Sequence, residues 1–363
     1  NVKDIVARFQ HVEGQRDNWN NHYQELADYM LPRKADIVKK RSRGEKRMEL
    51  IFDGTALQSV DLLSSSLHGM LTSGATPWFH LTMKDEELGR DEEVQRWLED
   101  SSQRMMRAFT MSNFETEVHE MYVDLVVFGT GCMFVEMDDK TLRFSTRHIS
   151  EFYVTEDQYG IVDTVFRKYE IPARQAVQRF GIDNVGAFIA KTFEKKPDEN
   201  VTILHAVMPR KDRDPTKANN KNMPYASMYI CMETKMILAE SGFQELPYVV
   251  PRFLKATGEV MGRSPAMVAL PDVKMINLMS KTIIQAAQKM IDPPLLVPDD
   301  GFLLPIRTQP GGLNFYRSGS RDTITPLQTG ANIPIGLNME EQRRLAIRSA
   351  FFVDQLLSGN TPN

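Results

Sequence analysis

Apolar side chains return every third or fourth residue over much of the first 130 positions, which is the spacing of an amphipathic helix. Three stretches show it most clearly, at residues 19–30, 56–70 and 114–128. The first ends at Pro32, where a helix should stop. The other two follow Asp53 and Asn113, residue types that cap helix N-termini. The pattern predicts three helices.

After Gly131 the pattern becomes that of extended chain. Runs at 132–137 and 141–147 flank Asp138-Asp139-Lys140, which predicts a hairpin. A short helix is expected between Pro172 and Gly181. Further strands are expected at the remaining apolar runs, 161–171, 201–208, 225–232, 236–240 and 248–253. Residues 1–262 therefore read as one α+β domain, with helices first and a mixed sheet after.

The last hundred residues are organised differently. A long helix is predicted over residues 265–291 and ends at Asp292-Pro293-Pro294. Residues 294–337 are rich in Pro and Gly with short apolar runs, and a second helix is predicted to start near Asn338 and run to about residue 357. Two helices that bracket a small strand-and-turn module predict a protrusion.

Composition narrows the choice of protein class. The chain has 363 residues and a net charge of -4, which argues against a protein that coats nucleic acid through a generally basic surface. Its 21 methionines favour a self-assembling protein, because thioether side chains fill adaptable interfaces. Cys132 and Cys231 are far apart and are predicted to be buried thiols. No apolar run is long enough to span a membrane.

A search for catalytic motifs is negative. The chain carries no GxxxxGK[ST], HExxH or GxSxG motif and no EF-hand loop, and no two histidines are spaced to share a helix face. Gly129-Thr130-Gly131 is interpreted as close backbone packing at a corner between helix and strand. We therefore expect no enzyme, no metal site and no cofactor.

Charge is distributed unevenly along the chain. A basic cluster at 39–47 is either a solvated loop or a contact to phosphate or to an acidic partner, and residues 85–140 are acidic enough to repel DNA. On the predicted helix 265–291, a polar stripe lies beside a mostly apolar one and acids are absent from 273 to 291. Such a stripe is either an ordinary solvated face or a surface for transient contact with a polyanion. Its members are Lys274, Asn277, Lys281, Gln285 and Gln288.

Several short stretches, taken in order, resemble the portal (head-to-tail connecting) proteins of short-tailed bacteriophages. The most telling are Gly262-Arg-Ser-Pro265, Ala269-Leu-Pro-Asp272 and the segment 292–301 that begins Asp-Pro-Pro. Residues 22–33, 51–55, 67–81 and 128–131 precede them, and Pro310-Gly-Gly-Leu-Asn314 follows. Together they cover most of the chain from about residue 20 to 360.

The resemblance implies a portal-type fold and a mechanical function. It implies a wing at 1–262, stem helices at 263–293 and 338–357, a clip at 294–337 and the start of a tunnel loop at 358–363, with the crown outside this chain. Such subunits form a ring, commonly a dodecamer, at one capsid vertex of the virion, and are assembled in the host bacterial cytoplasm. The ring seeds procapsid assembly with capsid protein and scaffold, docks the terminase large subunit, conducts double-stranded DNA and binds a tail adaptor. The alternative is another ring component of the connector, such as an adaptor or tail protein.

The stripe on the first stem helix is expected to line the channel and contact DNA. If that stripe faces outward, Arg344 and Arg348 of the second helix line the channel instead. The clip is expected to contact terminase and adaptor. Its candidate residues are Arg307, Asn314, Tyr316, Arg317 and Arg321.

Overall fold

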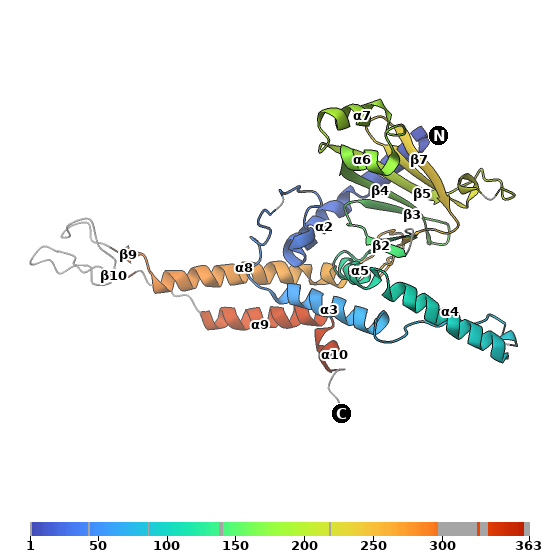
Figure 1. Ribbon diagram of the computed structural model, residues 1–363. Helices are drawn as coiled ribbons and strands as arrows, with labels where there is room; N and C mark the ends of the chain where they lie inside the picture. The colour runs from blue at the N-terminus through green and yellow to red at the C-terminus, as the bar shows by residue number, and fades with distance from the viewer. Residues whose placement is uncertain are drawn as a thin grey trace, which may run out of the picture.

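A computed structural model describes residues 2–42, 44–85, 87–137, 141–217, 219–296, 325–326 and 333–358. Figure 1 shows a body of helices and sheets from which two long helices, α8 and α9, extend together to one side, while α4 extends away from the body on the other. The expected α+β class is confirmed.

The three helices that the apolar spacing predicts are present as α2 (Asp17–Met30), α3 (Thr55–Leu71) and α5 (Phe114–Phe128). The N-terminal part also contains helices outside these three stretches, which are α1 (Val2–Gln15), η1 (Pro32–Lys34), η2 (Leu88–Arg90) and α4 (Glu92–Thr110). Asn113 stands at the N-cap of α5, but its side chain makes no cap hydrogen bond. It instead bonds both the N–H and the carbonyl of Phe144, at 2.9 and 2.8 Å, and so fastens α5 to a strand.

Two larger sheets follow, and both are antiparallel. The strands β1 (Met133–Met137), β2 (Leu142–Thr146) and β8 (Tyr248–Val249) form one sheet in the order β2-β1-β8. The second sheet has the order β3-β4-β5-β6-β7. Its strands are β3 (Phe152–Glu156), β4 (Val162–Pro172), β5 (Asn200–Pro209), β6 (Tyr225–Cys231) and β7 (Met236–Phe243). The prediction of a mixed sheet is therefore wrong, because every pair of neighbouring strands in these two sheets is antiparallel.

Helices cover both faces of the five-stranded sheet. Phe9 of α1 packs edge-on against Phe166 on one face, with ring centroids 5.8 Å apart. The helices α6 (Ala173–Phe180) and α7 (Gly186–Lys195) cover the other face, and η3 (Asn220–Asn222) lies beside β7. Cys132 and Cys231 are buried free thiols, as predicted.

The main core joins this body to the long helices. It contains buried side chains of α2, α3, α5 and α8, together with Ile347 and Phe351 near the end of the chain. Gly129, at the end of α5, crosses Gly262, which precedes α8. A Cβ on Gly129 would lie 2.4 Å from the Gly262 carbonyl oxygen, and Gly129 has a φ of +76°. The predicted close backbone packing at this corner is confirmed.

The first long helix, α8 (Pro265–Ile291), has the predicted bounds. The second differs. α9 (Ile333–Ala350) starts before Asn338, and a turn separates it from α10 (Val353–Ser358). Pro334 explains the early start, because proline fits the first turn of a helix. Phe352 adopts a φ of +59°, and this break directs Phe351 and Val353 into the core.

Most of the predicted clip lies outside the described residues. Within the part that is described, β9 (Leu295–Leu296) pairs antiparallel with β10 (Thr325–Pro326). The start of the predicted tunnel loop after residue 358 also lies outside the described residues.

Candidate functional site: the α8–α9 stem

We call α8 and α9 the stem, because they lie side by side and project from the body (Figure 1). Ser264 anchors its inner end. The Ser264 hydroxyl accepts a hydrogen bond from the N–H of Met267 at 3.1 Å, which caps α8, and donates one to the carbonyl of Val127 in α5 at 2.8 Å. The sequence supports this start, since serine is a preferred N-cap and Pro265 occupies the first helical position.

The predicted apolar stripe of α8 is buried only in its inner part. Val273, Ile276 and Ser280 are buried, whereas Met290 near the outer end is 52% exposed. The helices α9, α5 and α2 pack against α8. The apolar stripe is therefore buried near the body and exposed at its outer end.

Four of the five predicted channel residues are exposed. Lys274 is one of them, but its Nζ lies 2.8 Å from a carboxylate oxygen of Glu25 in α2, and this hydrogen bond raises the pKa of Lys274. Lys281 makes a cation–π contact, with its Nζ 5.6 Å from the ring centroid of Phe52. Gln285 and Gln288 line an open hollow at the outer end of α8.

Asn277, the fifth predicted channel residue, is only 3% exposed. Its Oδ1 accepts hydrogen bonds from the N–H groups of Phe52 and Asp53 at 2.6 and 3.1 Å, and its Nδ2 donates to the carbonyl of Val273 at 2.8 Å. The prediction that Asn277 lines the channel is wrong. An amide can satisfy donors and acceptors of the backbone at once, so it can point inward from a stripe that looks polar in sequence.

The alternative channel candidates differ from one another. Arg344 is 27% exposed and forms ion pairs with Asp53 at 2.9 Å and Glu340 at 3.1 Å, so its charge is matched within the chain. Burial opposes ionisation of Asp53, but hydrogen bonds from Thr55 and Arg344 outweigh it and lower the pKa of Asp53. Arg348 is 41% exposed and lies 3.9 Å from Glu341.

A buried acid that sequence reasoning missed links the two stem helices. Glu340 of α9 is 4% exposed and accepts a hydrogen bond from the Ser280 hydroxyl of α8 at 2.6 Å. Its other oxygen pairs with Arg344. The four-residue spacing from Glu340 to Arg344 is a signal for an ion pair on one helix face, but it does not reveal that the face is buried.

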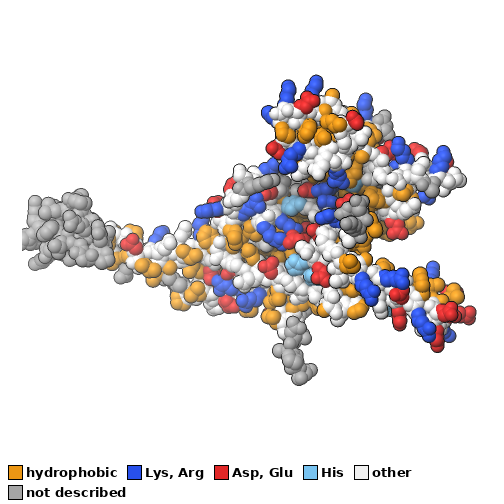
Figure 2. Space-filling view, viewed as in Figure 1, with side chains coloured by type: hydrophobic (Ala, Val, Ile, Leu, Met, Phe, Trp, Pro, Cys, Tyr) orange, Lys and Arg blue, Asp and Glu red, His pale blue; other side chains and the backbone are white. Residues whose placement is uncertain are grey.

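Apolar side chains remain exposed on both stem helices. On α8 these include Val268, Met275 and Leu278, which follow one another at helical spacing and lie next to the lysine–glutamine stripe. Leu337, Met339 and Leu345 are exposed on α9. Figure 2 shows the resulting hydrophobic surface along the stem.

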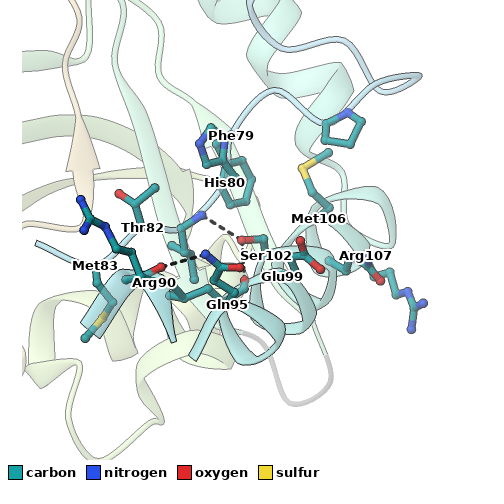
Figure 3. Close-up of a pocket in the computed structure, with 15 residues that line it drawn as sticks. Phe79, His80, Thr82, Met83, Arg90, Gln95, Glu99, Ser102, Met106 and Arg107 are labelled. Atoms are coloured by element: carbon teal, nitrogen blue, oxygen red, sulfur yellow. Dashed lines mark hydrogen bonds between the residues drawn. The ribbon is translucent and has the colours of Figure 1, made fainter. Parts of the chain in front are cut away.

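A cavity lies elsewhere in the molecule, beside α4. It measures about 850 Å³ and is formed by residues 77–83 and one face of α4 (Figure 3). Ser102 points into it, but its hydroxyl accepts from the N–H of Leu81 at 2.9 Å and donates to the carbonyl of Leu98 at 2.8 Å. The serine thus completes backbone hydrogen bonding and is not poised as a nucleophile.

Residues 2–363 match the family of bacteriophage head to tail connecting proteins. The chain belongs to this family. It is also 32% identical over 99% of its length to the probable portal protein of Bordetella phage BPP-1, and 30% identical over 96% to the portal protein of Salmonella phage epsilon15. It spans 67% and 64% of the length of these two relatives.

Membership of the connecting-protein family confirms the resemblance inferred from the short motifs, and with it the role of a phage portal component. Both relatives are named portal proteins, which favours this role over that of an adaptor or tail protein. Families of this kind are structural.

The described residues of this connecting protein include neither a cluster that could hold a metal ion nor a helix that could span a membrane. Across 2–296 and 333–358, apart from the gaps given above, no three His, Cys, Asp or Glu side chains are grouped closely enough to hold a metal ion. No helix within the described chain is both long and apolar enough to cross a bilayer. The clip candidates Arg307, Asn314, Tyr316, Arg317 and Arg321 lie outside the described residues and stay predictions.

Proposed function

We propose that this chain is the subunit of a closed portal ring at the head-to-tail connection of the virion, through which double-stranded DNA passes. Family membership supports the role of portal component. The twelve-fold ring number, assembly in the host cytoplasm and contacts with capsid protein and scaffold are expectations from the resemblance. The names of the two relatives do not state these features.

The main support for the proposed ring is the exposed apolar surface of the stem. Each stem helix buries one side against the other stem helix and the body, and Leu278 of α8 and Met339 of α9 remain exposed, at 67% and 50%. Burying apolar area contributes roughly 25 cal/mol per Å². If α8 of one copy packs on α9 of the next, two different surfaces meet, and such contacts close into a ring.

Leu278→Asp tests the ring directly. The charge would lie in the contact between copies, so the mass measured by light scattering should fall from a large oligomer to smaller species, while the circular dichroism spectrum is retained. Ile182→Asp is the matched control, because Ile182 is also exposed, at 48%, but lies between α6 and α7. A wild-type chain that is monomeric at micromolar concentration contradicts the proposal.

For the DNA path, we propose the face of α8 that carries Lys281, Gln285 and Gln288. Lys274 shares this face, but Glu25 offsets its charge. Duplex DNA carries about one negative charge per 1.7 Å of axis, so a circle of single lysines attracts it at every rotational position. A circle of isolated lysines attracts the duplex only weakly, which suits a conduit through which DNA must slide.

Lys281→Gln in assembled particles tests this path. We expect normal ring assembly, with DNA packaging or retention altered in a way that depends on salt concentration. Lys191→Gln on α7 is the control for loss of one exposed lysine. Normal packaging by Lys281→Gln together with defective packaging by Arg348→Gln would assign the channel to α9 instead.

We further propose that residues 294–337 carry the contacts to the terminase large subunit and the tail adaptor. The support is that Leu295–Leu296, the described start of this segment, follows the outer end of α8 and pairs with Thr325–Pro326. A short Gly-Ser linker in place of residues 297–324 should leave the body folded, as judged by its thermal unfolding, and abolish packaging. Normal packaging by this variant would overturn the assignment.

A further inference from the structure

Three arginines come together where the five-stranded sheet meets the three-stranded sheet. Arg167 lies on β4, Arg179 on α6, and Arg147 directly follows β2. On one face of the five-stranded sheet, Arg167 pairs in register with His205, and His205 with Tyr229. Residues directly opposite in adjacent strands share a face. Figure 1 shows α6 over the five-stranded sheet and β2 close to that sheet's edge.

Ring contacts place all three arginines around this row. The guanidinium of Arg179 donates to the Tyr229 hydroxyl at 2.9 Å, and the Tyr229 ring stacks on His205 with centroids 4.1 Å apart. Phe134 meets His205 edge-on at 5.7 Å. The guanidinium carbon of Arg147 lies 5.4 Å from the centroid of Phe134, so Arg147 reaches the row from the side of the three-stranded sheet.

Tyr169 lies next to Arg167 on the same face of the sheet, because the two residues are two positions apart on β4. The guanidinium carbon of Arg167 is 4.0 Å from the centroid of the Tyr169 ring. Tyr169 is 7% exposed, and its hydroxyl has no hydrogen-bond partner among the residues described. A buried hydroxyl without a partner is costly, so it calls for a group that is not part of the described chain.

The positive charge of this cluster is only partly matched. Glu151 forms an ion pair with Arg167 at 2.8 Å, and Glu136 on β1 lies close enough to affect Tyr229. The Nε of Arg147 is buried and unpaired in the part of the chain that the structure describes. Burial, and then the charge of Arg167, lowers the pKa of Arg147.

His205 adds no charge to the cluster. It is fully buried between the Tyr248 hydroxyl and the Ser227 hydroxyl, each at 2.9 Å, and burial keeps its pKa well below the usual range. Three guanidinium groups therefore face two carboxylates, which leaves an excess of one positive charge. An excess charge beside unpaired buried donors is the chemistry of an anion site.

We propose that Arg147, Arg167 and Arg179, with the hydroxyl of Tyr169, form a binding site for an oxyanion the size of one phosphate group. Guanidinium groups present planar forks that match phosphate and carboxylate oxygens. A phosphate has enough oxygens to accept from Arg147, Arg179 and Tyr169 together. The same chemistry could be supplied by a carboxylate of another protein, and the two sources can be separated by experiment.

The test is titration of the purified, assembled protein with inorganic phosphate, followed by calorimetry at constant ionic strength against chloride. Acetate is the probe for a carboxylate. We expect saturable phosphate binding with one site per chain and weaker acetate binding. Arg147→Gln should weaken phosphate binding by about tenfold or more, as expected for loss of a charged hydrogen bond. Arg174→Gln, an exposed position on α6, is the matched control and should bind normally.

Tyr169→Phe keeps the test valid if an arginine variant fails to fold, because the hydroxyl it removes has no partner in the chain. It should fold as well as the wild type and bind phosphate more weakly. Absence of saturable phosphate binding to the wild type overturns the proposal. Phosphate binding that appears only in a Glu151→Gln variant also overturns it, since Glu151 would then supply the anion to the cluster.

Discussion

Replacing Asn277 by alanine should destabilise the fold, although sequence analysis places this residue on an exposed channel face. The side chain holds the Phe52–Asp53 backbone against α8 through two hydrogen bonds, and makes a third to the Val273 carbonyl within α8. Alanine fits the helix without strain, so the change removes these bonds and little else.

The magnitude follows from the groups left behind. Two backbone N–H groups lose their acceptor, and a stranded donor with little access to water costs about 1–3 kcal/mol. Alanine recovers about 0.5 kcal/mol through its higher helix propensity. We therefore expect the free energy of unfolding to fall by about 2–4 kcal/mol.

Urea unfolding at matched protein concentration measures this loss, since assembly makes stability depend on concentration. Gln285→Ala is the control on the same helix, and should change the free energy of unfolding by less than about 0.5 kcal/mol because Gln285 is exposed. Equal stability of the two variants would refute the reasoning.

Two further predictions concern the inner end of the stem. Gly129→Ala should lower the free energy of unfolding by about 3 kcal/mol, measured by heat or urea, because the new Cβ meets the Gly262 carbonyl and the backbone is left-handed. Gly258→Ala is the control, since Gly258 has a φ of +83° and open space around it, and should lower the free energy of unfolding by about 1 kcal/mol. Similar losses in the two variants would contradict the close approach of Gly129 to Gly262. The lowered pKa of Asp53 means that its ionised form stabilises the fold above its ordinary pKa of 3.8, and that this contribution is lost as the pH falls below that value. Asp53→Asn should accordingly lower stability at pH 7 by about 1–3 kcal/mol and flatten its dependence on pH between 7 and 3, and an unchanged pH profile would exclude the ion pair with Arg344.

The elements that the sequence predicts well are those whose pattern is local. Apolar periodicity and the prolines Pro32, Pro265 and Pro293 place the end of α2 and both ends of α8 almost to the residue. The stripe of α8 is less predictable, because Asn277 looks the same in sequence as Gln285. Only the approach of residues 52 and 53, more than 220 positions away, turns one inward and leaves the other exposed.

The second stem helix shows a different limit. Its break at Phe352 has no glycine or proline to announce it, and arises because Phe351 and Val353 both pack in the core. The buried acid Glu340 was missed for a similar reason, since its partner Ser280 lies on another helix. The arginine cluster around Tyr169 likewise combines side chains from three separate elements, which no single motif could reveal.

Because burial along α8 is uneven, the stem is held firmly at its inner end and less firmly at its outer end. Hydrogen bonds from Ser264, Asn277 and Ser280 fix its inner part to α5, to the backbone of residues 52 and 53, and to α9, whereas no residue of α8 beyond Ser280 is fully buried. The outer part, 281–291, is about 16 Å long at 1.5 Å per residue, and Ile283 within it still packs against Gly336 of α9. A sideways load at its tip is therefore taken up first by bending of this less buried length, and a load along its axis passes towards the core at Gly129 and Gly262.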